Sequence, residues 1–179
     1  MAENGWAVLD CDEIARQVVA PGERGLKRLV AGFGPAIVMA DGTLDRGRLR
    51  QMMLETPDVK HQLDRILHPL IEERMKVLMD IELTETSHRV AAVEVPLLFE
   101  SGLDGNFDLN IAVVGQHDRL VSRISQRDQV SEHKAESLLA LQMDQQEKSR
   151  RADYTIINNR GVAQLFELVD KLMDKIEKE

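Results

Sequence analysis

The stretch VLDCDEIAR, residues 8–16, decides how the chain is read, because an apolar run passes directly into carboxylates and then into a helical pattern. The apolar run ends at Leu9, and Asp10 and Asp12 follow two residues apart. Residues 13–19 then carry an apolar stripe at helical spacing. Open α/β sheets bind ligands just beyond the carboxyl ends of their strands, and carboxylates in the turn between a strand and a helix lie at such a place. A simpler interpretation is that Asp12 only caps the helix by accepting a backbone N–H.

The bulk composition fits one globular domain over residues 1–179, with 43% hydrophobic residues. A formal net charge of -8 argues against a non-specific nucleic-acid binder, although one cationic pocket for a phosphate ligand stays compatible with it. Cys11 is the only cysteine, and the five histidines lack metal-ligand spacing. No apolar run is long enough for a membrane span, and no signal pattern opens the chain. These features predict a reducing, cytoplasmic setting without membrane partners.

Hydrophobic periodicity and caps predict strands that alternate with helices. We expect strands at residues 6–9, 90–95, 109–114 and 154–157. We expect helices at residues 13–19, 25–34, 46–54, 57–67, 70–81, 118–126, 131–141, 142–151 and 162–178, with Asp45 and Ser131 as caps. His68-Pro69 is expected to break one helix and open the next, inside a nearly all-helical block at residues 13–85. Such alternation predicts a parallel α/β sheet with right-handed crossovers.

Six sequence elements occur in one order along the chain. They are VLDCDEIARQVV (8–19), DGTLDR (41–46), HPL (68–70), EVPLLFE (94–100), QRD (126–128) and ADYTIINNRG (152–161). Together they closely resemble the dephospho-coenzyme A kinase family, which uses ATP to phosphorylate the ribose 3′-hydroxyl of dephospho-CoA in the last step of coenzyme A biosynthesis. The resemblance implies a three-layer α/β/α fold of the P-loop kinase type. It also implies that residues 13–85 form a helical CoA-binding insert and residues 126–152 a helical lid.

One departure from the family concerns the phosphate-binding loop. The family opens with a strand, a G-x-x-x-x-G-K-[ST] loop and a helix, and this sequence contains no such motif. Residues 1–4 followed by Gly5 resemble the last turn of a helix. We therefore expect the first, central strand to be absent from this chain, through a misassigned start codon, a shortened chain or a decayed paralogue.

That departure has two physical consequences. The loop would hold the β- and γ-phosphates and Mg²⁺. Unpaired backbone groups beside a lost central strand would each cost about 1–3 kcal/mol, against a total stability of roughly 5–15 kcal/mol. We therefore expect this chain alone to be neither an active kinase nor a stable monomer. The alternative is a non-catalytic remnant that binds CoA metabolites or a partner protein, and the oligomeric state does not follow from the sequence.

The resemblance assigns roles to residues at the expected transfer site. Asp12 resembles the catalytic aspartate that contacts the ribose 3′-hydroxyl. Arg127 is expected to stabilise charge on the transferring phosphoryl group, because guanidinium donors suit phosphate oxygens. Lys148 and Arg151 are expected to assist Arg127 in holding ATP. A stripe formed by Arg119, Arg123 and Arg127 is open to a simpler interpretation as a solvated face, which we adopt for the first two.

Asp10 and Glu94 lie at the expected ends of strands. One interpretation is that they lie near Mg²⁺ without binding it directly, in its second shell; the alternative is that they have no metal role. His68 and Pro69 are expected to contact the acceptor, dephospho-CoA; a buried, hydrogen-bonded His68 is the alternative.

Three further positions follow from the resemblance. Pro96 and Leu97 are expected to shape the acceptor pocket, and packing is the competing explanation. Asn159 and Gly161 resemble the loop beside the adenine of ATP, although turn chemistry alone also explains both residue types. The expected partners are therefore dephospho-CoA and ATP, without nucleic acid.

Overall fold

A computed structural model describes residues 5–86 and 88–178 of the chain. It confirms an α/β fold with parallel strands. The chain divides into two compact units, one extending to Val95 and the other starting at Pro96. Residues 1–4, for which a last helical turn is predicted, lie outside the described residues. Within the described part of the chain, none of the helices is both long and apolar enough to span a bilayer.

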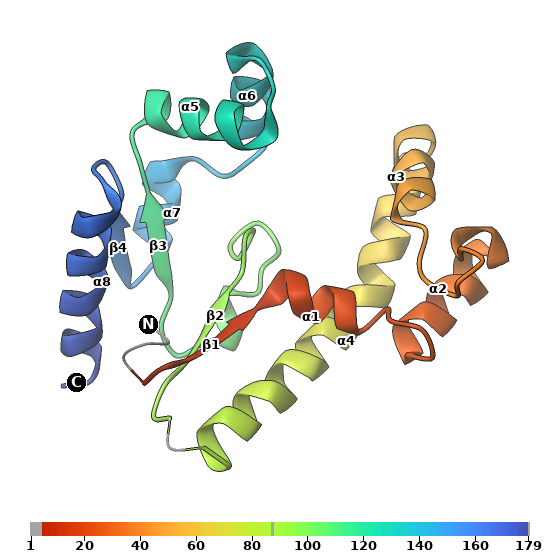
Figure 1. Cartoon of the computed structure of the whole chain (residues 1–179), viewed down its shortest axis with the longest axis horizontal. Helices are drawn as coiled ribbons and strands as arrows, with labels where there is room; N and C mark the ends of the chain where they lie inside the picture. Colours follow the sequence, from red (N-terminus) through yellow and green to blue (C-terminus); the bar gives the residue numbers. More distant parts are fainter. Residues whose placement is uncertain (1–4, 87, 179) are drawn as a thin grey trace. The chain divides into compact units, whose positions relative to one another are not determined.

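The first unit contains a parallel pair of strands from distant parts of the sequence. β1 (Ala7–Asp10) pairs with β2 (Ala91–Glu94) in a register that sets Ala7 opposite Ala91 and Asp10 opposite Glu94. Both strands fall where the apolar runs predict them. Figure 1 shows β1 leading straight into the first helix. The register therefore brings two carboxylate-bearing residues to the same end of the strand pair.

The helices of the first unit gather around one long helix. They are α1 (Cys11–Gln17), α2 (Arg24–Phe33), the 3₁₀ turn η2 (Pro35–Ile37), α3 (Arg46–Glu55) and α4 (Pro57–Thr84). α1, α2 and α3 each pack against α4 (Figure 1). Their shared core contains Ile14, Leu29, Ile37 and Met75, which are fully buried. The prediction of a nearly all-helical block between the first two strands is therefore confirmed.

The predicted helix break at His68-Pro69 is wrong. α4 runs without interruption from Pro57 to Thr84, with Pro69 inside it. A proline in a helix interior removes one backbone hydrogen bond and crowds the preceding turn. Leu70, directly after the proline, is buried, and so are Met75 further along the helix and Val59 before the proline. Burial of the apolar face on both sides of Pro69 offsets the local cost, so packing overrides the sequence signal.

The second unit contains another parallel pair. β3 (Ile111–Val114) pairs with β4 (Tyr154–Ile157). The helical segments are the 3₁₀ turn η3 (Asp104–Asn106), α5 (His117–Asp128), α6 (Glu132–Leu139), α7 (Gln145–Arg151) and α8 (Val162–Ile176). α5 packs on α6, α7 lies against β3, and α8 lies against β4 (Figure 1). Ala112 on β3 and Ile156 on β4 are buried.

The strands within the described residues form two separate pairs, β1–β2 and β3–β4. Each strand of a two-stranded sheet keeps one unpaired edge. Val113 and Ile157 in the second pair are each 56% exposed, although parallel strands are usually covered on both faces. That the family's first, central strand is absent from this chain stays a prediction.

Capping residues fix several helix starts as the sequence predicts. Asp45 accepts a hydrogen bond from the N–H of Arg48, and Ser131 accepts one from Lys134. The predicted helical arm at 142–151 begins later, at Gln145. Asp144 caps it by accepting from the N–H groups of the second and third residues after it, at 2.8 and 3.4 Å. The arm is therefore shorter than its polar pattern indicates.

Gly25 is required by a close approach of two backbone segments, which gives a stability prediction. Its N–H donates to the carbonyl of Val18 at 3.1 Å, and a Cβ at this position would collide with that same carbonyl group. Gly25→Ala should lower the free energy of unfolding by about 1–3 kcal/mol, as other overpacked sites do.

Gly32 in the same helix is the matched control, because its added Cβ would meet only Ile66 Cδ1 at 3.4 Å. Gly32→Ala should raise stability by about 0.5–1 kcal/mol, through the lower entropy cost of alanine in a helix. Urea unfolding measures both changes. Equal shifts in the two variants would contradict a steric role for Gly25.

Candidate functional site

The turn between β1 and α1 assigns different tasks to its two aspartates. Asp10 is the N-cap of α1, and its Oδ1 accepts from the N–H of Asp12 at 2.8 Å and from that of Glu13 at 3.3 Å. The interpretation in which Asp12 only caps the helix is therefore wrong. The exposed Asp12 carboxylate has no hydrogen-bond partner among the described residues. It is free to accept a proton or a hydrogen bond from a ligand at the positive end of α1.

Asp10 and Glu94 form a pair of acidic residues at the carboxyl ends of β1 and β2, opposite each other in the strand register. Carboxylate oxygens are the ligands that Mg²⁺ prefers, usually one or two together with substrate phosphates. Among the described residues no group of three or more acidic, histidine or cysteine side chains is arranged to hold a metal by itself. The donor set therefore fits a metal shared with a phosphate ligand, and a Mg²⁺ role for these two residues stays a prediction.

Cys11 lies between the two aspartates and reports on the electrostatics of this turn. Burial is the largest cause that raises the pKa of its thiol, and the charges of Asp12 and Asp10 raise the pKa further. A thiol whose pKa is raised is protonated at neutral pH and is a poor nucleophile. The turn is therefore a negative site suited to base chemistry or cation binding rather than to thiol chemistry.

A cavity of about 480 Å³ in the second unit brings together three of the residues predicted from the sequence, Pro96, Arg127 and Lys148. The rest of its lining consists of Val113, Leu120, Arg123, Ile124, Leu139, Gln142 and Gln145. α5 supplies the two arginines and α7 supplies the lysine. Its three cations, two amide side chains and apolar residues are chemically suited to an anion such as a polyphosphate.

Arg127 is held by its own neighbour. Its Nε donates to Asp128 Oδ1 at 2.7 Å, and its Nη2 donates to Oδ2 at 3.1 Å. These hydrogen bonds raise the pKa of Arg127, and they lower the pKa of Asp128. The Arg127 side chain is 76% exposed, so solvent screens this pair strongly. A phosphate ligand can therefore compete with Asp128 for the guanidinium.

Arg123 is a residue whose role the sequence interpretation missed. Its Nη2 donates to the backbone carbonyl of Asn158 at 3.0 Å and to Asn158 Oδ1 at 3.2 Å. It lines the same cavity as Arg127, one helical turn away. The interpretation of Arg123 as merely solvated is wrong. The i, i+4 spacing of the two arginines was the available signal.

Lys148 and Arg151 are both anchored by the loop that follows β2. Lys148 Nζ lies 3.2 Å from Glu100 Oε1. Arg151 donates to Asp104 Oδ2 at 2.6 Å and to the carbonyl of Phe99 at 3.3 Å, and its guanidinium lies 5.0 Å from the centre of the Phe99 ring. Lys148 lines the cavity and Arg151 does not, so only the first is brought to Arg127.

The other predicted site residues lie elsewhere. His68 is half-buried in the middle of α4, with Nε2 3.7 Å from Asp64 Oδ1, and Pro69 beside it is exposed. Leu97, 47% exposed, follows Pro96 but does not line the cavity. Their roles toward the acceptor stay predictions.

Asn159 and Gly161 lie in the turn after β4. Asn159 Oδ1 accepts from the N–H of Gln116 at 2.7 Å, which ties this turn to the start of α5. Gly161 is the N-cap of α8. Both residues thus have a local structural task, and their role beside adenine stays a prediction.

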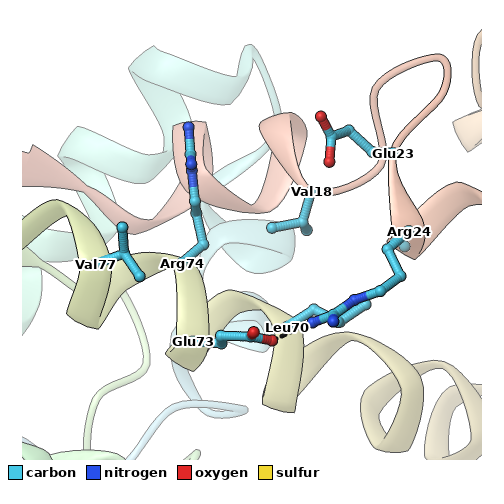
Figure 2. Close-up of a pocket in the computed structure, with 8 residues that line it drawn as sticks. Val18, Glu23, Arg24, Leu70, Glu73, Arg74 and Val77 are labelled. Atoms are coloured by element: carbon cyan, nitrogen blue, oxygen red, sulfur yellow. Dashed lines mark hydrogen bonds and ion pairs between the residues drawn. The ribbon is translucent and has the colours of Figure 1, made fainter.

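The first unit holds a smaller groove of about 210 Å³ between α1, α2 and α4. Its lining consists of Val18, Glu23, Arg24, Gly25, Leu70, Glu73, Arg74 and Val77. Figure 2 shows Arg24 reaching toward Glu73, with which it forms an ion pair, and Arg74 extending from α4 toward α1. Two arginines and two glutamates leave the groove without net charge. None of the residues predicted from the sequence lines it.

Comparison with known proteins gives one consistent family. The profile described as "Dephospho-CoA kinase" matches residues 1–164. A protein named dephospho-CoA kinase from Bdellovibrio bacteriovorus is 36% identical over 170 residues, covering 95% of this chain and 84% of that protein. One of the same name from Shewanella oneidensis is 39% identical over 160 residues, covering 89% of this chain and 76% of that protein.

Solved structures agree with this result. Dephospho-CoA kinase from Campylobacter jejuni matches with a TM-score of 0.73 at 26% identity, covering 99% of this chain and 88% of that one. The protein TT1252 from Thermus thermophilus matches with a TM-score of 0.75 at 27% identity, covering 97% of this chain and 86% of that one. The predicted fold of the P-loop kinase type is therefore confirmed.

The cavity on α5 and α7 gives a prediction for anion binding. Arg127→Ala should weaken binding of inorganic tripolyphosphate about tenfold, the size expected for losing one charge-assisted contact. Isothermal titration calorimetry at low salt measures the affinity. Arg119→Ala is the matched control, because Arg119 belongs to the same helix and is exposed but does not line the cavity. Equal losses in both variants would mean that only general surface charge attracts the anion.

Proposed function

Because the chain belongs to the dephospho-CoA kinase family, we propose that its residues carry out phosphoryl transfer from ATP to the ribose 3′-hydroxyl of dephospho-CoA. Membership of the family implies the last step of coenzyme A biosynthesis. The single observation that supports the assignment of roles is that the two aspartates at the β1–α1 turn have different contacts. Asp10 is occupied as a helix cap, whereas Asp12 has no partner among the described residues.

Asp12 is the proposed group that receives the proton of the acceptor hydroxyl. A positioned general base contributes roughly 10²–10⁴-fold to a transfer of this kind. Its place in the first turn of α1 also puts the carboxylate at the positive end of the helix dipole. The proton therefore passes from the ribose oxygen to Asp12 as the O–P bond forms and the bond to the leaving phosphate of ATP breaks.

The cavity of the second unit is the proposed site for the phosphates of ATP. Charge spreads over the oxygens of the transferring phosphoryl group, and fixed cations stabilise it. Arg127, Arg123 and Lys148 line this cavity together. Arg127 is the proposed contact to the transferring phosphoryl group. Its ion pair with Asp128 is more exposed than that of Lys148 with Glu100, so a ligand displaces it more easily. Asp10 and Glu94 are the proposed carboxylates near a Mg²⁺ ion, which would neutralise negative charge on the phosphates of ATP.

The helical block of the first unit is the proposed acceptor-binding region. The pantetheine arm of dephospho-CoA carries two amides, one hydroxyl, two methyl groups and a thiol, and it has no net charge. The groove between α1, α2 and α4 combines apolar walls formed by Val18, Leu70 and Val77 with a balanced set of charges. This match in polarity supports the groove as a place for the arm, with α1 connecting it to Asp12.

Turnover by the 179 residues themselves is a separate question. We expect no ATP consumption above background when ATP, Mg²⁺ and dephospho-CoA are supplied. The sequence contains no G-x-x-x-x-G-K-[ST] motif to hold the β- and γ-phosphates. Chromatographic separation of CoA from dephospho-CoA measures the reaction. A robust rate would refute the requirement for that loop.

Translation of the genomic sequence upstream of Met1 separates the two functional classes. An in-frame glycine-rich loop ending in Gly-Lys-Ser or Gly-Lys-Thr would support the kinase. An in-frame stop codon would instead support a non-catalytic binder of CoA metabolites or of a partner protein.

Asp12 gives a prediction that does not require turnover. The carboxylate should accept a hydrogen bond from the 3′-hydroxyl of dephospho-CoA and repel the 3′-phosphate of CoA. Asp12→Asn should therefore shift the ratio of the two affinities toward CoA by about tenfold, the effect of removing one close like-charge interaction. Calorimetric titration with both ligands measures the ratio, and the melting temperature should change little.

Glu13→Gln is the matched control, since Glu13 lies next to Asp12 in the same turn and its side chain pairs, within the described part of the chain, only with Arg16. That variant should leave the ratio unchanged. An unchanged ratio in Asp12→Asn would remove Asp12 from contact with the 3′ position.

A further inference from the structure

Glu100, the last residue of EVPLLFE, makes two contacts with one carboxylate oxygen. Its Oε1 accepts a hydrogen bond from the N–H of Met143 at 2.8 Å and lies 3.2 Å from Lys148 Nζ. Met143 belongs to the segment just before α7, and Lys148 lies on α7 itself. A single oxygen therefore fixes both the entry to the helix and the cation that the helix carries.

This pair is shielded from solvent more than the pairs Arg127–Asp128, Arg150–Glu147 and Arg151–Asp104 of the second unit. The side chains of Lys148 and Glu100 are 14% and 20% exposed, against 76% for Arg127. Burial alone would raise the pKa of Glu100, but the hydrogen bonds from Met143 and from its own backbone, with Lys148, outweigh burial and lower it. Glu100 is therefore ionised at neutral pH. Removing one partner of such a pair leaves the other poorly compensated.

The contacts of Glu100 lead to the cavity, although Glu100 does not line it. Lys148 lines the cavity, and so do Gln142 and Gln145 on either side of the Met143 segment. A lysine side chain has a flexible four-carbon stem, and ordering it costs rotamer entropy. The contact with Glu100 orders the Lys148 side chain before a ligand binds. An anion then finds the ammonium group already in place.

We infer that Glu100 is a positioning residue that holds Lys148 and the start of α7 on the wall of the anion-binding cavity. The inference deepens the proposed function and rests on the assignment of that cavity to the phosphates of ATP. It gives the final glutamate of EVPLLFE a task that requires no contact with ATP or dephospho-CoA.

The position of Lys148 is tested by its rate of acetylation with acetic anhydride, followed by peptide mass spectrometry. The exposed Lys134 serves as the internal reference. Lys148 should react slowly in the native protein and about tenfold faster in Glu100→Ala, as expected when one hydrogen-bonded partner is lost. Glu100→Gln keeps an acceptor oxygen but loses the charge, so its rate should lie between the two. An unchanged ratio of Lys148 to Lys134 in either variant would overturn the inference.

Asp104→Asn is the matched control, because Asp104 anchors α7 from the same loop through Arg151 rather than through Lys148. It should weaken the loop-to-helix attachment without exposing Lys148. Faster acetylation of Lys148 in this variant would mean that any loosening of α7 releases the lysine. That result would also overturn a specific role for Glu100.

A double-mutant cycle on ATP binding tests the consequence for the ligand. Lys148→Ala and Glu100→Ala should each weaken ATP binding, and the double variant should bind no more weakly than Lys148→Ala alone. Additive losses would assign Glu100 a general structural role and overturn the inference. If ATP affinity is insensitive to Arg127→Ala and Lys148→Ala alike, the proposed phosphate site fails. In that case the acetylation result still decides whether Glu100 holds Lys148.

Discussion

Parallel pairing of distant strands is the constraint on which the rest of this structure depends. β1 pairs with β2, and β3 pairs with β4, with long helical crossovers between the members of each pair. Parallel pairing brings carboxyl ends to the same edge, where the following turns meet. In the first unit this edge sets Asp10 opposite Glu94. In the second unit the turns after β3 and β4 are joined by the hydrogen bond from Gln116 to Asn159.

The local arrangement of ion pairs, rather than the net charge of the chain, decides where positive charge gathers. A net charge of -8 describes the whole sequence, yet three cations line one cavity. Lys148 is held in a shielded pair with Glu100, whereas Arg127 shares an exposed pair with Asp128. Solvent screening makes the exposed pair the easier one to exchange. The cavity thus combines a fixed cation, Lys148, with Arg127, which can exchange Asp128 for another anion. This combination suits an anionic ligand whose charge distribution changes during a reaction.

Local patterns predicted most of the fold because the forces that they report act locally. The four apolar runs became strands, and Asp45 and Ser131 became caps, because a short β-branched run or a capping oxygen needs few neighbours. The break at Pro69 failed for the opposite reason. Whether a helix tolerates proline depends on how much apolar surface the flanking turns bury, and that is decided by the helices packed against α4.

The candidate site was predicted less completely, because its contacts join residues far apart in sequence. Asp12, Arg127 and Lys148 could be chosen from motif and charge. The backbone geometry of one turn decides that Asp10 caps the helix, and Asp12 then has no hydrogen-bond partner among the described residues. Arg123 was dismissed because its partner, Asn158, follows a different strand.

Glu100 shows the same limit in a motif that was itself recognised. EVPLLFE marked the family, but neither its composition nor its spacing indicated that the last glutamate reaches α7. A carboxylate that is mostly buried in a cationic neighbourhood has two physical options, to bind a cation from solution or to hold one from the chain. The hydrogen bond from Met143 and the contact with Lys148 fill the acceptor sites of one oxygen with groups from the chain. Glu100 therefore holds part of the chain in place, whereas Asp12, in the turn after β1, keeps a carboxylate without a hydrogen-bond partner among the described residues.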